Sequence, residues 1–331
     1  MFKTKLKAWI QASRLPSQGY IFFPLLLGQA FWFSRTGHFN WPMAALTWLF
    51  GVAIQLYIVY ANDVADATID RLNATFTPFS GGSRVLAEGK LTASELKAGV
   101  AVSVGINVLI GLFLWIKGLP LGPGLILIAL ALLWLYSFPP VRLSYRGGGE
   151  LLQMIGVGII LPVLGYYLQA GSLAGFPFQY LAVLLPLQLA CAFSTTLPDE
   201  PSDRMGGKKT IAVIFGLTHA KRIVVGLHAM VPVMLAGFIV TNHASASLFL
   251  ILAVSLLLIV VLLCFLPRAE PGNRAMLGFV TISILATLSV TAALAIERFF
   301  AGSEVATSPF LGGEPQCQCV AEIKQGQTVY W

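Results

Sequence analysis

The chain has 331 residues, of which 57% are hydrophobic and only 11% are charged. Ordinary soluble domains carry about 25% charged residues, and the mean hydropathy here is +0.80. A water-soluble surface is therefore excluded, and much of the protein must face lipid. The net charge of +7 follows from the topology described below and predicts no nucleic-acid partner.

Nine apolar runs are long enough to cross a bilayer, whose hydrocarbon core requires about 20 residues per helix. In chain order they cover residues 15–35, 42–62, 95–116, 120–138, 151–170, 178–197, 220–241, 247–266 and 275–300. The short gap between the third and fourth runs leaves a count of eight open. We predict an all-α polytopic membrane protein, with nine transmembrane helices forming a bundle around a central cavity in residues 1–301. The polar tail, residues 302–331, is expected to be disordered.

The basic residues predict an orientation. With the N-terminus inside the cell, only four of the 21 Lys and Arg residues lie outside, namely Arg35, Lys117, Arg298 and Lys324. Such an excess of positive charge marks the cytoplasmic side. We expect a multi-pass protein of the cell (inner) membrane, with its N-terminus and its polar loops cytoplasmic and its C-terminal tail on the opposite side.

The four cysteines predict neither a disulfide framework nor a metal centre. Cys191 and Cys264 lie in apolar runs, where cysteine behaves as a small hydrophobe. Cys317 and Cys319 are too close in the tail for an easy mutual disulfide.

All five aspartates of the chain lie in two short stretches at predicted cytoplasmic helix ends. The first stretch contains Asn62, Asp63, Asp66 and Asp70. If the second helix continues through it, these four side chains project within an arc of about 100°. They therefore form one polar face.

The second acidic stretch follows the sixth run and contains Asp199 and Asp203, one helical turn apart. Pro198 and Pro201 bracket its start, where proline disrupts a plain helix. Pro198 is instead expected to open a new helical turn. The facing geometry of the two carboxylates depends on that turn.

A single aspartate at a helix end often does no more than solvate it. Several carboxylates on one face repel one another, and at a helix C-terminus they also oppose the helix dipole. A cation between them offsets both effects. Hard oxygen ligands favour Mg²⁺ or Ca²⁺ over zinc, and magnesium prefers a few carboxylates together with substrate phosphate oxygens. The two stretches therefore predict a magnesium–diphosphate site.

Basic residues in the polar loops suit a phosphate ligand. Each loop combines them with glycines, which allow close backbone approach. They are Arg84 after Gly81-Gly82, Arg142 and Arg146 before Gly147, and Lys208 and Lys209 after Gly207.

Together these residues resemble the UbiA superfamily of intramembrane aromatic prenyltransferases. The resemblance covers roughly residues 10–300 and includes an N-D-x-x-D-x-x-x-D motif and a D-x-x-x-D motif. These motifs are matched by Asn62, Asp63, Asp66 and Asp70, and by Asp199 and Asp203. Within the superfamily, residues 12–14, 79–83, 143–147 and 207–210 are most similar to 1,4-dihydroxy-2-naphthoate prenyltransferases of menaquinone synthesis.

The resemblance implies a polyprenyl diphosphate donor, a small aromatic acceptor and Mg²⁺ as cofactor. The implied metal ligands are Asn62, Asp66, Asp70, Asp199 and Asp203. Diphosphate is expected to contact Arg84, Arg142, Arg146 and Lys208 or Lys209. Asp63 is the candidate base, and the candidate substrate-binding residues are Arg14, Tyr57, Tyr136 and Tyr145, although aromatic residues at helix ends also act as interfacial anchors.

Other functions stay open on the sequence alone. Within the superfamily, the alternative acceptors are 4-hydroxybenzoate, homogentisate and a tetrapyrrole alcohol or acid. A cation-coupled transporter is a further alternative, although its carboxylates are expected near the bilayer midplane and not at helix ends. A non-catalytic structural role is the last. The sequence specifies neither the prenyl chain length nor the oligomeric state.

Overall fold

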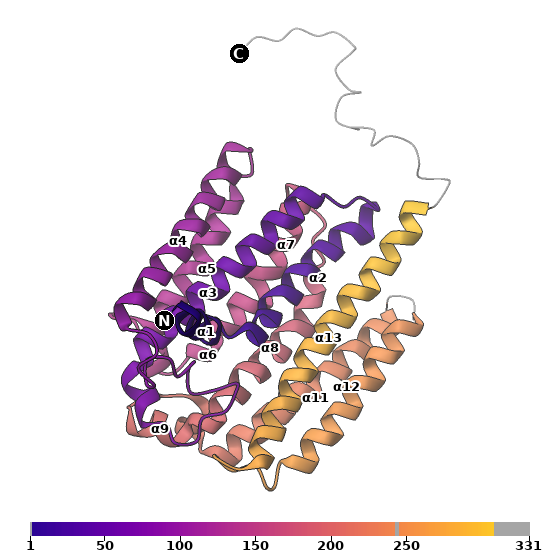
Figure 1. Ribbon diagram of the computed structural model, residues 1–331. Coiled ribbons are helices and arrows are strands. Elements are labelled where there is room, and N and C mark those ends of the chain that lie inside the picture. The colour runs from indigo at the N-terminus through magenta and orange to yellow at the C-terminus, as the bar shows by residue number, and fades with distance from the viewer. Residues whose placement is uncertain (1, 242–244, 308–331) are drawn as a thin grey trace, which may run out of the picture.

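The computed structural model describes residues 2–241 and 245–307, and this part of the chain folds into a bundle of helices (Figure 1). Seven helical stretches are long and apolar enough to cross a membrane. They are Trp41–Leu72, Ala93–Ile116, Gly149–Ala170, Phe178–Met205, Leu217–Thr241, Ala246–Phe265 and Arg274–Thr307. This confirms an all-α polytopic membrane protein.

The sequence predicted nine spans where the structure has seven of this kind. The two other predicted runs are also helical. Leu121–Ser137 is apolar but has only 17 residues, and Gln18–Thr36 contains polar residues such as Gln29 and Arg35, which lower its hydropathy. Helix at all nine predicted positions is thus observed, but two of the helices do not carry the full signature of a span.

The chain up to residue 137 contains five α-helices and one short 3-10 turn. These are α1 (Phe2–Ala12), the turn Leu15–Ser17, α2 (Gln18–Thr36), α3 (Trp41–Leu72), α4 (Ala93–Ile116) and α5 (Leu121–Ser137). Local signals fix their starts. The Asn40 side chain accepts a hydrogen bond from the Met43 amide at 3.1 Å and caps α3. Thr92 and Glu95 form a capping box at the start of α4.

The second half begins with one apolar helix that contains a π-helical turn. It comprises α6 (Gly149–Ile155), the π-turn Gly156–Ile160 and α7 (Leu161–Ala170). The remaining α-helices are α8 (Leu181–Thr196), α9 (Glu200–Met205), α10 (Ile211–Phe215), α11 (Leu217–Thr241), α12 (Ala246–Phe265) and α13 (Arg274–Thr307). α13 continues six residues past the predicted start of the tail at residue 302. Residues 308–331, including Cys317 and Cys319, lie outside the described residues.

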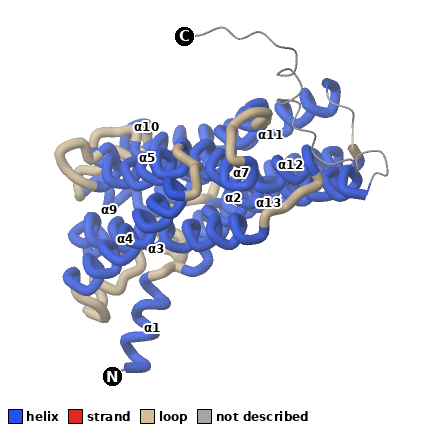
Figure 2. The backbone as a smooth tube through the Cα atoms, turned by 90° about the horizontal axis from the view of Figure 1, so that it is seen from above, coloured by secondary structure: helices blue, strands red, loops and turns tan. Residues whose placement is uncertain are grey.

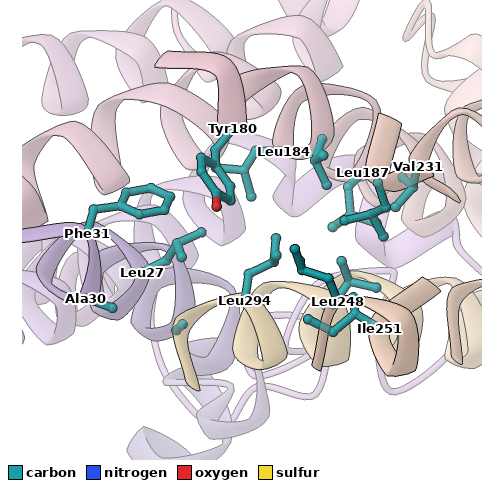
Figure 3. Close-up of a cluster of buried hydrophobic side chains, with 14 of the residues drawn as sticks. Leu27, Ala30, Phe31, Tyr180, Leu184, Leu187, Val231, Leu248, Ile251 and Leu294 are labelled. Atoms are coloured by element: carbon teal, nitrogen blue, oxygen red, sulfur yellow. The ribbon is translucent and has the colours of Figure 1, made fainter. Parts of the chain in front are cut away.

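Buried apolar side chains join the helices of the two halves. In the cluster of Figure 3, Phe31 and Leu27 of α2 face Tyr180 and Leu184 beside them, and Leu294 of α13 closes the group. Phe31 and Tyr180 lie 4.7 Å apart between ring centroids. Because the lipid supplies no hydrophobic driving force, this close packing is what holds the helices together.

The outer helices keep apolar side chains on the surface. Only 22% of the apolar window of α12 is buried, against 61% for the helix Gly149–Ala170 in the centre. Leu250 and Leu257 of α12 are more than half exposed. Such a surface suits contact with lipid tails.

The polar loops collect at one end of the bundle. In Figure 1 the connections α3–α4, α5–α6 and α9–α11 all lie at the end that carries α9, while the α4–α5 turn lies at the opposite end. α1 lies across the bundle axis near the same polar end and projects from the side of the bundle in Figure 2. This end contains both acidic stretches.

Candidate active site

A cavity of about 750 Å³ opens among α2, α3, α5, α6 and α13 at the polar end of the bundle. One part of its wall is apolar and includes Ile54, Leu133, Val157 and Leu285. The other part is polar. A cavity of this size and mixed lining is typical of a small-molecule site.

The structure brings most of the predicted site residues to this wall and leaves others away from it. On the wall are Arg14, Asn62, Asp66, Asp70, Arg84, Tyr136, Asp199, Asp203 and Lys208. Among the described residues, those that do not contribute to it are Tyr57, Asp63, Arg142, Tyr145, Arg146 and Lys209.

The first acidic stretch lies on a continuous helix, as the predicted arc requires, because α3 extends to Leu72. Asp66 is the centre of its contacts. Its carboxylate lies 2.7 Å from the Lys208 ammonium and accepts a longer bond of 3.3 Å from the Tyr145 hydroxyl. Within the described part of the chain, no side-chain hydrogen bond reaches Asn62 or the carboxylate of Asp70, so both oxygens of Asp70 are available to a ligand.

The second acidic stretch is helical throughout, although it consists of three successive elements. α8 ends at Thr196, a 3-10 turn spans Leu197–Asp199, and α9 follows, with Pro198 and Pro201 each in the first turn of a new element. Proline is tolerated there because the first amides of a helix have no intrahelical partner. Asp203 therefore points back toward Lys208, at 3.9 Å between Oδ1 and Nζ.

Lys208 joins the two stretches electrostatically. Burial alone would lower the pKa of its ammonium, but the neighbouring Asp66 and Asp203 carboxylates raise the pKa above its usual value. Lys208 therefore stays charged. Burial and the nearby Asp66 carboxylate also raise the pKa of the Tyr145 phenol, to about 12, so Tyr145 acts as a neutral donor.

The loop between α3 and α4 closes over the acidic residues. Asp199 holds it, since its carboxylate accepts hydrogen bonds from the Asn73 side chain at 2.7 Å and from the Gly81 amide at 2.9 Å. Gly82 adopts a φ of +72°, and a Cβ there would lie 2.1 Å from a carboxylate oxygen of Asp70. Only glycine allows the loop to approach Asp70 this closely.

Three arginines share an unusual backbone. Arg14, Arg84 and Arg142 are the residues other than glycine that have positive φ in the described part of the chain, at 43°, 68° and 46°. Each also has a buried Nε–H without a hydrogen-bond partner. Left-handed backbone in non-glycine residues concentrates at functional sites. Arg14 and Arg84 line the cavity, so their unpaired donors suit an anionic ligand.

The remaining predicted residues lie around this centre. Arg142 stacks on the Tyr145 ring, 3.4 Å from its guanidinium carbon to the ring centroid. Arg146 is exposed and donates to the Pro140 carbonyl at 2.8 Å. Tyr57 is buried between α3 and α5, where its hydroxyl donates to the Leu130 carbonyl at 3.2 Å. Lys209 is exposed, so Lys208 is the member of the predicted pair that reaches the carboxylates.

Asp63 does not suit the base role suggested above. Its carboxylate is 3% exposed, forms an ion pair with Arg14, and accepts hydrogen bonds from the amide and hydroxyl of Ser83. A base must lie within hydrogen-bond reach of the proton that it takes up, whereas Asp63 does not line the cavity and both of its oxygens accept from protein donors.

Sequence reasoning missed three residues that shape the site. Asn73 and Ser83 hold the α3–α4 loop to Asp199 and Asp63. Glu150, buried at the start of α6, accepts a hydrogen bond from the Ile211 amide at 2.9 Å and fixes the chain just after Lys208. An acid that opens an apolar helix was the available signal for Glu150. Ser83 lies in the stretch 79–83 singled out above, but its contact with Asp63 was not predicted, and nothing in the sequence marked Asn73.

A metal ion fits this donor set only together with a ligand. In residues 2–241 and 245–307, no group of three His, Cys, Asp or Glu side chains is placed to hold a metal by itself. Magnesium usually binds through one or two carboxylates, water and substrate phosphates. Asn62, Asp66, Asp70, Asp199 and Asp203 border the cavity and suit that mode. Asp66 and Asp199 also accept hydrogen bonds from protein donors on both of their oxygens.

The cavity combines carboxylates, a buried lysine and arginines with an apolar part of its wall, an arrangement that suits an amphiphilic anion. The model of the UbiA prenyltransferase family matches residues 21–296. The chain therefore belongs to this family.

Curated relatives are distant. The chain is 24% identical over 173 residues to a 1,4-dihydroxy-2-naphthoate octaprenyltransferase of Bacillus subtilis, covering 51% of this chain and 54% of that protein. It is 26% identical to the enzyme of the same name from Haemophilus influenzae, covering 65% and 71%. It is also 28% identical to a homogentisate phytyltransferase of Synechocystis, covering 51% and 54%. The chain thus spans about half the length of two of these relatives.

Solved structures share the fold. A UbiA homologue from Archaeoglobus fulgidus, bound to DMAPP and Mg²⁺, superposes with a TM-score of 0.67 at 17% identity, covering 90% of this chain and 99% of that one. An apo UbiA homologue from Aeropyrum pernix gives a TM-score of 0.62 at 20% identity, covering 84% and 97%.

Proposed function

We propose that this protein transfers a prenyl group from a prenyl diphosphate to an aromatic acceptor. The observation that carries the proposal is the divided cavity, which has carboxylates, Lys208 and unpaired arginine donors at one end and an apolar chamber at the other. A prenyl diphosphate has the same division, with a charged head and a hydrocarbon tail. Family membership supports the reaction class.

The proposal assigns separate roles to the polar residues of the cavity. Asn62, Asp66, Asp70, Asp199 and Asp203 are proposed to hold Mg²⁺, which when bound neutralises the diphosphate and favours its departure. Arg14, Arg84 and Lys208 donate to the leaving diphosphate as negative charge develops on it. The carbon–oxygen bond breaks with its electron pair going to diphosphate, and the acceptor ring then forms the new carbon–carbon bond. The apolar wall excludes water from the allylic cation.

The proposed acceptor is 1,4-dihydroxy-2-naphthoate, with loss of its carboxylate as CO₂, as in menaquinone synthesis. Support comes from the loops at residues 79–83, 143–147 and 207–210 and from two relatives of that name. Homogentisate is the second candidate, because a relative at 28% identity carries that activity in its name. 4-Hydroxybenzoate is the third.

A panel of acceptors separates these candidates. The purified full-length protein is incubated with farnesyl diphosphate, Mg²⁺ and each acceptor in turn, and both prenylated product and CO₂ are measured. We expect labelled CO₂ from carboxyl-labelled naphthoate in a one-to-one ratio with product. Prenylated 4-hydroxybenzoate that retains its carboxylate, without naphthoate product, contradicts the acceptor but preserves the reaction class.

For topology, we propose that the nine predicted helical runs all cross the membrane, with the acidic end and the N-terminus cytoplasmic. The positive charge of the loops at that end supports this orientation.

A further inference from the structure

We infer that Asp63 is a positioning residue whose carboxylate holds Arg14 and Ser83 together, so that the Arg14 guanidinium faces the anionic end of the cavity. This inference rests on the proposed function, because it assigns Arg14 to the prenyl diphosphate. It concerns three segments distant in sequence: the start of the bundle, α3 and the α3–α4 loop.

The first step is the buried position of Asp63. An ionised carboxylate at 3% exposure is stable only when paired and hydrogen-bonded. Arg14 supplies the charge, and the Ser83 amide, at 3.2 Å, and its hydroxyl supply two hydrogen bonds. These three contacts engage both oxygens, so the Asp63 carboxylate is held by protein donors from two other segments.

The second step is the strained backbone of Arg14. Its φ of 43° is left-handed, a conformation that persists only when neighbours enforce it. Ser17 does so from one side, because its amide and hydroxyl donate to the Arg14 carbonyl at 2.8 and 2.6 Å. Asp63 enforces the other side by pairing with an Nη group. The guanidinium is thereby fixed on the cavity wall with its Nε–H unpaired.

The third step is the double attachment of Ser83. While Asp63 accepts from its amide and hydroxyl, its carbonyl accepts from the Gln11 side chain of α1 at 2.8 Å. The neighbouring Gly82 lies against Asp70. Movement at Ser83 would therefore displace the loop over the acidic site, and loss of the Asp63 carboxylate releases Arg14 and the loop together.

Steady-state kinetics and a double-mutant cycle test the interaction between Arg14 and Asp63. The protein is assayed in nanodiscs with farnesyl diphosphate as wild type, Arg14→Gln, Asp63→Asn and the double variant. Arg71→Gln is the control, since Arg71 is an exposed cation on α3, the helix that carries Asp63. We expect each single change to raise the KM for farnesyl diphosphate about tenfold and to change kcat much less. The KM of the double variant should equal that of the more impaired single variant, because both changes break the same interaction. The control should match wild type.

A second readout does not require turnover. Hydrogen exchange at the amides of residues 81–85 should be faster in Asp63→Asn than in wild type without any substrate, and unchanged in the Arg71 control. If wild type neither binds farnesyl diphosphate nor forms product while exchange at Ser83 accelerates as stated, the proposed function fails and the positioning role of Asp63 stands. If Asp63→Asn lowers kcat alone, shifts the pH profile and leaves both KM and exchange unchanged, Asp63 is a base and the inference is overturned.

Discussion

Two neighbouring lysines differ completely in environment. Lys208 is buried against Asp66 and Asp203, whereas Lys209 is exposed and its amide donates to the Ser144 carbonyl at 3.2 Å. The sequence presents them as equivalent, because their order in the loop does not reveal which one turns inward. The turn after Met205, with its left-handed Gly207 at φ +75°, decides this.

The first prediction concerns this pair. Lys208→Met should lower kcat/KM by about two orders of magnitude, because it leaves Asp66 buried and unpaired and removes a donor to the leaving group. Lys209→Met should stay within about twofold of wild type. Prenyl transfer by the two purified variants is measured together with their expression in the membrane. Equal losses in both would mean that Lys208 has no special role.

The magnesium dependence of activity distinguishes the proposed metal ligands Asp70 and Asp203 from other acidic residues. Asp70→Asn and Asp203→Asn should raise the Mg²⁺ concentration for half-maximal activity about tenfold or more, because each removes a hard anionic ligand. EDTA should abolish activity in wild type, and Mg²⁺ should restore it. Glu304→Gln, an exposed acid that does not line the cavity, is the control. Full activity of wild type in EDTA would contradict the metal requirement.

The helices were the most predictable feature, and the loops the least. Long apolar runs identify helices such as α3 because the bilayer imposes both length and composition. α1 was not predicted, since its run is too short and too basic to resemble a span. The π-turn at Gly156–Ile160 also escaped prediction, because one extra residue in a turn leaves no trace in hydropathy.

In the site, likewise, the residues on a helix were predictable and the contacts made by loops were not. The polar residues Asn62, Asp66 and Asp70 were predicted to share a helix face, and the continuous α3 places all three on the cavity wall. Asp63 was placed at the edge of that face, but its partners come from Arg14 and Ser83 in other segments. Contacts between segments distant in sequence do not appear in the pattern of one helix.

The α3–α4 loop supplies a prediction at the level of elements. Gly82→Ala should lower activity strongly, because its Cβ would lie 2.1 Å from Asp70, in addition to the strain of a positive φ. Gly89→Ala is a matched control in the same loop, with a φ of +66° and nothing within 4 Å of its Cβ. Activity and thermal stability are measured for both. Similar activity in the two variants would show that backbone strain, and not the approach to Asp70, matters.

At the scale of the whole molecule, the bundle is polar at one end only. The end of the bundle that carries α9 contains the acidic stretches, the buried Lys208 and the basic loops. The α4–α5 turn and the connection after α7 lie at the opposite end of the bundle (Figure 1). A water-soluble diphosphate head and a lipid-soluble tail can then enter one site from different phases. Under the proposed function, the polar end faces the compartment that contains the prenyl diphosphate.

The last prediction therefore concerns orientation. In a variant with Cys317 and Cys319 changed to Ser, a single reporter is introduced by Lys209→Cys at the acidic end or by Ser172→Cys after α7. Both positions are exposed. Of the natural cysteines left, Cys191 is buried, and the exposed Cys264 is also changed to Ser. An impermeant maleimide should label the Ser172→Cys protein in intact cells and the Lys209→Cys protein only after the membrane is opened, because Lys and Arg loops stay cytoplasmic. The reverse pattern would place the acidic site outside the cell and invert the proposed topology.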